Sequence, residues 1–343
     1  MSVFARTSFS AKSYVAFRPS YPTSLYSKVL RYTQPGSQNT CLLDLGCGHG
    51  IAASSLSTHF TSVIGLDPSP GMIQQARSAN QNSNYSHAIS FHIGAAEDLS
   101  FLADASVDLV VSAQAAHWFD YGRLWPELAR VVKPKGALAF WGYKDNVILN
   151  FPEADRVFDR FIYGEGLVAE GVVGMGTFWE QPGRSILREL YRAIQPPEGE
   201  WRDVQRYEHE PGEEGGALAW TQRKRMTLGE LDGYLRTFSS YKAWKDEYGE
   251  KKGQRDVVDV LWETVIDAVE PWKAKKDSWR DIEIETDWGT YLLDELFHHL
   301  LLNADPKRTI HRALESEVLQ KIPWFQASKS VQWQVTGSKK RLG

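Results

Sequence analysis

The sequence contains little cysteine and no long apolar run. Only two of its 343 residues are cysteines, Cys41 and Cys47, so cysteine alone can build neither a disulfide framework nor a zinc site. No apolar run approaches the roughly 20 residues needed to span a bilayer. The first residues, MSVFARTSFSAKSYVAF, lack the continuous apolar core of a secretory signal. These absences predict a reducing, cytoplasmic setting, with no metal and no membrane partner.

An excess of basic residues is also missing. Lys and Arg number 39 against 43 Asp and Glu, which gives a formal net charge of −4, whereas nucleic-acid binders are normally basic. Hydrophobic residues make up 42% of the chain and charged residues 24%, as in ordinary globular proteins. The composition therefore favours a small-molecule partner over nucleic acid, and it leaves the oligomeric state open.

Short apolar runs alternate with amphipathic stretches between residues 22 and 143. The runs CLLDL, SVIGLD, ISFHI, VDLVVSA and ALAFWGY predict buried strands, and the stretches between most of them predict helices. This alternation predicts a parallel sheet with helices on both faces. After residue 143 the rhythm breaks; helical spacing returns at 228–244 and 254–269, and 282–293 predicts one or two edge strands.

These changes of pattern divide the chain into four predicted parts. The parts are a core with an N-terminal lid segment (1–143), an inserted cap or substrate region (144–227), helices and edge strands that complete the core (228–295), and a C-terminal extension of unknown role (296–343).

The run LLDLGCGHG carries alternate glycines, Gly46, Gly48 and Gly50, directly after a predicted strand. Its spacing is neither that of a dinucleotide fingerprint nor that of a P-loop. A tight strand-to-helix turn still exposes backbone N–H groups, which suit the carboxylate of an amino acid. Asp44, before the turn, can accept from an ammonium group directly or through a water, and Asp67, at the end of the second strand, can chelate a ribose diol.

Residues after the third predicted strand supply the remaining contacts that identify the ligand. Small Ala96 and Glu97 can edge an adenine ring, and a ligand with a carboxylate, an ammonium, a ribose and an adenine is S-adenosylmethionine (SAM). Arg18 lies in a segment that can fold over this cofactor. The remaining predicted cofactor contacts are Tyr14, Tyr21, Cys47, Pro68, Met72 and Gln114.

Longer motifs carry a resemblance to a known family. LLDLGCGHG, VIGLDPSPGMIQQA and VDLVVSAQAAHWFD resemble the class I SAM-dependent methyltransferases. FRPSYP, AHWFD, WGYKD, FWEQPGRSIL and LDGYLRTFSSYKAWK are similar to the fungal branch with trans-aconitate 3-methyltransferase and the cantharidin-resistance methyltransferase. The resemblance runs from about residue 10 to residue 295. It implies a Rossmann-like, seven-stranded α/β sheet and small-molecule methyl transfer.

The acceptor side of the predicted site centres on His117, which follows the fourth strand. His117 can orient a carboxylate, take a proton from a hydroxyl, or hold its own loop by bonding a backbone carbonyl. Arg184 offers a clamp for an anionic acid, and Trp179 offers a flat wall. The predicted substrate contacts are Trp118, Tyr143, Trp179, Gln181 and Arg184.

The leading hypothesis is therefore methyl transfer to the carboxylate oxygen of a small organic acid. A carboxylate is ionised at neutral pH and needs no general base. Two alternatives stay open: a hydroxyl or carbon acceptor in a fungal secondary metabolite, and a SAM-binding fold that carries out a non-methylating reaction such as a cyclisation.

Overall fold

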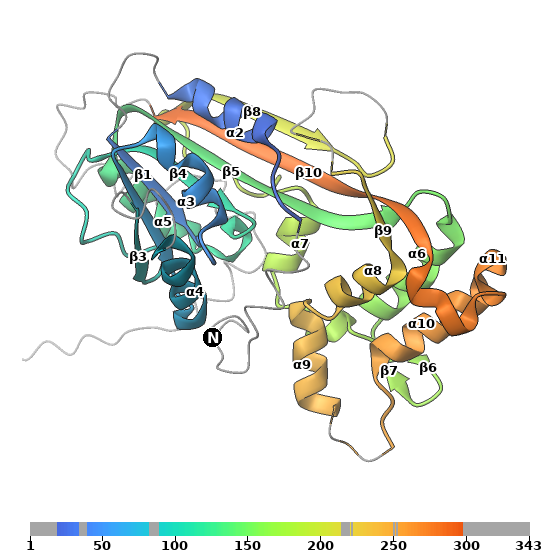
Figure 1. Cartoon of the computed structure of the whole chain (residues 1–343). Coiled ribbons are helices and arrows are strands. Elements are labelled where there is room, and N and C mark those ends of the chain that lie inside the picture. Colours follow the sequence, from blue (N-terminus) through green and yellow to red (C-terminus); the bar gives the residue numbers. More distant parts are fainter. Residues whose placement is uncertain are drawn as a thin grey trace, which may run out of the picture. The chain divides into compact units, whose positions relative to one another are not determined.

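The apolar runs predicted as strands lie side by side in one sheet (Figure 1). The computed structural model describes residues 19–33, 40–81, 89–213, 220, 222–249, 251 and 253–297. Within this part of the chain the sheet has eight strands. Their order is β3 (Ile89–Ile93), β2 (Ser62–Asp67), β1 (Cys41–Leu45), β4 (Val107–Ala113), β5 (Val132–Ile148), β10 (Glu283–Phe297) and β8 (Trp201–His209), and β9 (Lys224–Thr227) also pairs with β10.

All described residues belong to the first of two units of the chain, Met1–His299. The second unit, Leu300–Gly343, lies outside the described residues. Tyr14 and Arg18 also lie outside them, so their predicted cofactor contacts stay predictions.

The order in which the chain adds strands to the sheet reverses at β1. Strands β1 to β5 are parallel, and β10 is antiparallel to each of its partners β5, β8 and β9. The chain adds β2 and β3 on one side of β1 and then crosses to the other side for β4. Ligands of open α/β sheets bind at the carboxyl ends of strands beside such a reversal. The seven strands from β3 to β8 confirm the predicted Rossmann-like sheet, to which β9 adds an eighth.

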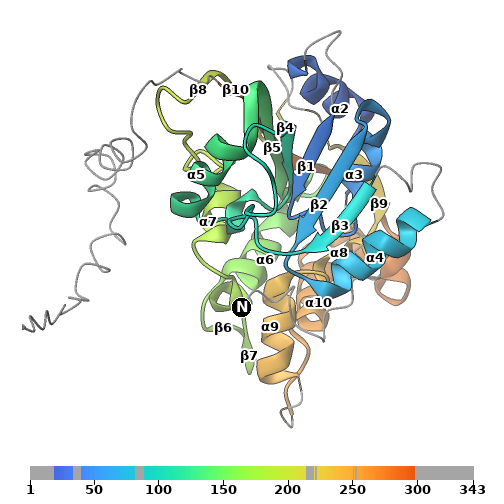
Figure 2. The same cartoon turned by 90° about the vertical axis from the view of Figure 1, so that its left-hand side faces the viewer.

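Helices cover both faces of the parallel strands, as predicted (Figure 2). Adjacent residues of β1 point in opposite directions: Leu42 belongs to the core beneath α2, α3 and α4, and Leu43 to the core beneath α5 and α7. No helix in the described ranges is long and apolar enough to cross a membrane. The helices around the parallel strands are α2 (Thr23–Val29), η2 (Leu30–Tyr32), α3 (Ile51–Leu56), η3 (Ser57–His59), α4 (Pro70–Gln81), η4 (Ala116–Trp118), α5 (Tyr121–Val131) and α7 (Gly183–Arg188).

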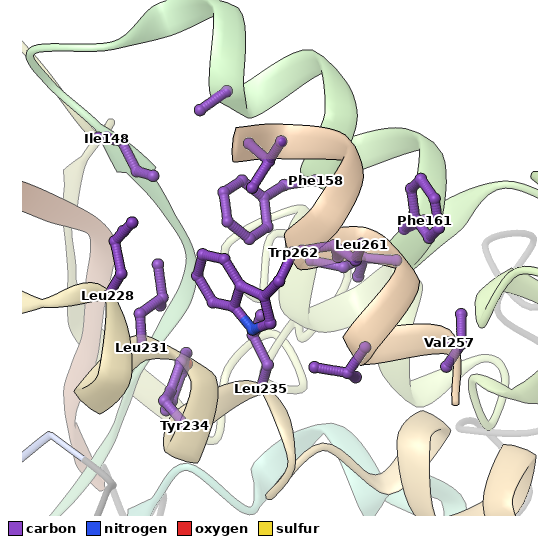
Figure 3. Packing of buried hydrophobic residues seen from close by; sticks show 14 of the residues in the cluster. Ile148, Phe158, Phe161, Leu228, Leu231, Tyr234, Leu235, Val257, Leu261 and Trp262 are labelled. Atoms are coloured by element: carbon purple, nitrogen blue, oxygen red, sulfur yellow. The ribbon is translucent and has the colours of Figure 1, made fainter. Parts of the chain in front are cut away.

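A third core lies beyond the parallel strands. Strands β5 and β10 have 17 and 15 residues, and they run side by side to a group of helices here called the cap (Figure 1). In the cap, helices α6, α8 and α10 pack around the indole of Trp262 (Figure 3). Its elements are α6 (Pro152–Tyr163), β6 (Leu167–Ala169), β7 (Val172–Val173), η5 (Gly176–Phe178), α8 (Leu228–Leu235), α9 (Ser239–Tyr248), α10 (Val257–Ala268), α11 (Glu270–Lys273) and η6 (Lys276–Asp281).

The predicted edge strand at 282–293 is wrong, because β10 lies inside the sheet with a partner on each side. Its adjacent residues Leu292 and Leu293 are buried in opposite cores, as an interior strand requires. On this side of the sheet the edge strands are β8 and β9, and the side chains of β8 are mostly exposed or half-buried. Residues 144–227, predicted as an inserted cap or substrate region, contain β8 and β9, and both strands pair with β10 in the sheet.

Candidate functional site

A cavity of about 260 Å³ lies at the carboxyl ends of β1, β2 and β4. Asp44, Gly50 and Gln181 do not line it. The predicted site residues that do line it are Tyr21, Gly46, Cys47, Gly48, Asp67, Pro68, Met72, Ala96, Glu97, Gln114, His117, Trp118, Tyr143, Trp179 and Arg184.

The glycine loop forms one wall of the cavity. Gly46 has a φ of +66°, and a Cβ atom there would lie 2.4 Å from the Cβ of Ala115. A Cβ at Gly50 would lie 2.6 Å from the Phe91 ring, so both glycines are required by packing. At Gly48 an added Cβ would meet no heavy atom of the described chain within 4 Å. Gly48 is therefore where a ligand can approach the backbone.

Asp67 places a carboxylate beside this wall. Its Oδ2 accepts from the backbone N of Gly48 at 2.9 Å, and its Oδ1 accepts from the backbone N of Ser69 at 2.8 Å. The side chain is only 9% exposed, and burial raises the pKa of its carboxyl, opposed by these two bonds. Each oxygen has a second lone pair, so the carboxylate can accept two hydroxyl groups, as the predicted ribose contact requires.

Asp44 lies beneath the loop instead of on the cavity wall. It is fully buried, and its Oδ2 accepts from the backbone N of Ala53 at 3.0 Å, which ties β1 to helix α3. Burial raises its pKa to about 7. Asp44 does not line the cavity, so its predicted contact with an ammonium group, direct or through a water, stays a prediction, and in the structure Asp44 ties the glycine loop to helix α3.

Two further side chains predicted to contact the cofactor, Glu97 and Gln114, form hydrogen bonds with backbone groups. Glu97 Oε1 accepts from the backbone N of Asp120 at 2.7 Å, which joins two loops that border the cavity. The Gln114 amide donates to the carbonyl of Tyr143 at 2.8 Å and accepts from its N–H at 2.7 Å. Gln114 also has a φ of +59°, an unusual conformation for a non-glycine residue. Gln114, directly after β4, thus ties the end of β4 to Tyr143 within β5 on the cavity wall.

His117 follows β4 on the short helix η4. Its side chain is 7% exposed and lines the cavity, and its Nδ1 lies 2.9 Å from the hydroxyl of Tyr191. The imidazole also contacts the ring of Trp118, with 4.6 Å between centroids. Because Nδ1 contacts Tyr191, a hydrogen bond from the imidazole to a ligand would involve Nε2.

The far end of the cavity is aromatic and ionic. The Arg184 guanidinium lies 4.0 Å from the centroid of the Trp179 ring and forms an ion pair with Asp145. Arg188 also reaches Asp145, with 3.3 Å between Nε and Oδ2. Gln181 instead accepts from Ser185 Oγ at 2.9 Å, at the start of helix α7, so it holds that helix and does not form the cavity wall.

Several wall residues were not singled out from the sequence. Lys144 and Asp145 follow Tyr143 in the WGYKD motif, and Tyr234 and Phe238 lie in the LDGYLRTF motif. The motifs therefore indicated the right segments, but the sequence did not show which side chains in them face the cavity. His49, in the glycine loop, also lines the cavity, and burial lowers its pKa. The additional wall residues are Pro19, Ile51, Ala95, Ala113, Ala115, Phe119, Leu187 and Ser239.

Comparison with known proteins finds that this chain is similar to methyltransferases. Residues 43–140, which span β1 to β5, match the family model described as a methyltransferase domain. The chain is 27% identical over 270 residues to a protein of Saccharomyces cerevisiae named as the S-adenosylmethionine-dependent methyltransferase CRG1, covering 75% of this chain and 87% of that protein. It is 28% identical over 258 residues to a protein of Dictyostelium discoideum named as a methyltransferase, covering 75% and 84%.

A solved structure shares most of the fold. It is that of a protein named as a type II methyltransferase of Anaeromyxobacter dehalogenans, with a TM-score of 0.57 and 26% sequence identity. The match covers 81% of this chain and 97% of that chain, so it extends well beyond the parallel strands.

Proposed function

We propose that this chain, a class I SAM-dependent methyltransferase, methylates the carboxylate oxygen of a small organic acid. The observation that carries this proposal is a single cavity with two unlike ends. One end has the glycine loop and Asp67, and the other has aromatic side chains with Lys144 and Arg184.

The loop end fits the cofactor. Gly48 leaves open space beside the backbone, and the Asp67 carboxylate faces the same space and can accept from both hydroxyls of a ribose. When bound, SAM supplies a methyl group activated by a sulfonium. The chain holds and orients the two reactants and excludes water between them.

The charge at the far end favours an anion. The wall residues there carry two cations, Lys144 and Arg184, against one carboxylate, Asp145. A substrate carboxylate could accept hydrogen bonds from Lys144 or Arg184 beside their present partners Glu210 and Asp145, and Trp179 and Phe238 would pack against its carbon skeleton. Because a carboxylate is already ionised, His117 needs only to orient it, and no side chain has to remove a proton.

A hydroxyl acceptor is the second candidate, and one observation favours it. Both cations on the wall already have carboxylate partners, Arg184 with Asp145 and Lys144 with Glu210. A neutral substrate with a phenol or alcohol, such as a secondary metabolite, would leave these pairs intact. His117 would then act as the general base.

The class of product separates the two candidates. We expect methyl-labelled SAM to label phenylacetate or trans-aconitate, and alkali to release the label as volatile methanol, because esters hydrolyse in alkali and ethers do not. The rate should be nearly constant between about pH 6 and 8, since the acceptor ionises near pH 4. Alkali-stable label on 2-phenylethanol or a phenol, with a rate that rises with pH, would instead establish the hydroxyl reaction.

Replacement of Arg184 tests the role of charge in acceptor binding. We expect Arg184→Gln to raise the KM for the acid about tenfold, or about 1.4 kcal/mol, with the SAM affinity unchanged. The matched control is Arg188→Gln, because Arg188 contacts the same carboxylate of Asp145 but does not line the cavity. Equal effects of the two variants on KM would show that Arg184 acts only by holding Asp145.

A further inference from the structure

The hydroxyl of Tyr191 approaches His117 from behind the cavity. Tyr191 is fully buried and does not line the cavity, yet its hydroxyl lies 2.9 Å from Nδ1 of His117. It follows helix α7, so this contact joins residues 74 positions apart in the sequence.

The chemistry of the two groups gives this hydrogen bond a direction. A phenol O–H is a better donor than the N–H of a neutral imidazole, and an imidazole nitrogen is a better acceptor than a phenol oxygen. The bond is therefore most stable when Tyr191 donates and Nδ1 accepts. In a neutral imidazole the proton then resides on Nε2.

The backbone around Tyr191 is held in an unusual conformation. Leu190 and Tyr191 have φ values of +55° and +60°, which non-glycine residues rarely adopt. Arg206 of β8 donates to the carbonyl of Tyr191 at 3.0 Å and fixes the segment against the sheet. Strained conformations of this kind concentrate at functional sites.

A second buried tyrosine, Tyr291, packs against Tyr191. The ring centroid of Tyr291, on β10, lies 4.1 Å from that of Tyr191. Burial, followed by the neighbouring Tyr191, raises the pKa of Tyr291 well above its ordinary value. Tyr291 therefore stays protonated, and its hydroxyl adds no negative charge beside Tyr191.

We propose that Tyr191 is a positioning residue that fixes His117 as the Nε2–H tautomer. His117 then offers an acceptor molecule a hydrogen-bond donor, and in this tautomer it cannot take up a proton at Nε2. This assignment rests on the proposed function, because a donor suits a carboxylate that is already ionised, whereas a hydroxyl acceptor would need an unprotonated Nε2.

The tautomer can be read directly by nitrogen NMR. The full-length chain, labelled with ¹⁵N-histidine and bound to S-adenosylhomocysteine, should give the Nε2–H pattern for His117, identified by its loss in His117→Gln. Tyr191→Phe should populate the Nδ1–H form. Tyr121→Phe is the matched control, because that hydroxyl donates to the carbonyl of Ala116 on the same turn at 2.7 Å and should leave the tautomer unchanged.

Kinetics give the second readout. Tyr191→Phe should lower kcat/KM for the methylated acid about 5- to 10-fold and should have no further effect in a His117→Gln background, since both changes remove one interaction. An Nδ1–H pattern in the unmodified protein, or independent losses in the double variant, would overturn the role of Tyr191. Absence of turnover of both phenylacetate and trans-aconitate would defeat the proposed function, whereas the NMR result decides the tautomer by itself.

Discussion

Asp67→Ala should weaken SAM binding by about 3 kcal/mol, or more than 100-fold in Kd, because two hydrogen bonds from a ribose to a charged acceptor would be lost. The carboxylate also accepts from the backbone of Gly48 and Ser69, so its removal loosens the loop that approaches the ligand. Titration calorimetry with SAM and with S-adenosylhomocysteine measures the effect, and both ligands should lose affinity equally because they share the ribose.

A carboxylate at the opposite end of the sheet provides the control. Asp108 accepts from the backbone N of Thr40 and Cys41, at 3.0 and 2.8 Å, and pairs with Lys133. Asp108→Ala should therefore destabilise the same parallel strands without a change in SAM affinity. If the two variants weaken SAM binding alike, the effect of Asp67 is structural and its ribose assignment is wrong.

Local chemistry explains why the cofactor end could be predicted. Gly46, Gly48 and Asp67 lie in or directly after short apolar runs, and the parallel arrangement of those runs brings their ends to one edge of the sheet. Asp44 shows the limit of this reasoning. Its position in sequence beside the loop is right, but the direction of its side chain depends on a bond to Ala53 in the following helix.

The acceptor end depends on contacts distant in sequence. The sequence predicts that Arg184 contacts a substrate, and in the structure Arg184 forms an ion pair with Asp145, a residue 39 positions away. In the cap, α6 packs with α8 and α10, although α6 precedes β8 in the sequence and the other two helices follow it. Strand β8 itself is polar along most of its length because it forms an edge, so no apolar period marks it.

The cap core offers the largest expected effect on stability. We expect Trp262→Ala to lower the free energy of unfolding by about 3–5 kcal/mol, the usual cost of removing a large buried aromatic side chain. The indole lies between α6 and α8 (Figure 3), contacts Phe158 edge-on at 5.5 Å between centroids, and donates to Asp232 Oδ1 at 2.8 Å. Urea denaturation followed by circular dichroism measures the change.

The position of Trp262 also predicts which activity suffers. Tyr234 belongs to the same core as Trp262 and lines the cavity, whereas Gly48 and Asp67 rest on the parallel strands. Trp262→Ala should therefore raise the KM for the acceptor while the Kd for SAM changes little. Trp279→Ala, which removes a half-buried ring stacked on Trp262 at 4.6 Å, should cost less stability. An equal loss of SAM affinity and acceptor binding in Trp262→Ala would mean that the cap and the cofactor end unfold together, so that the cap could not set acceptor choice independently of cofactor binding.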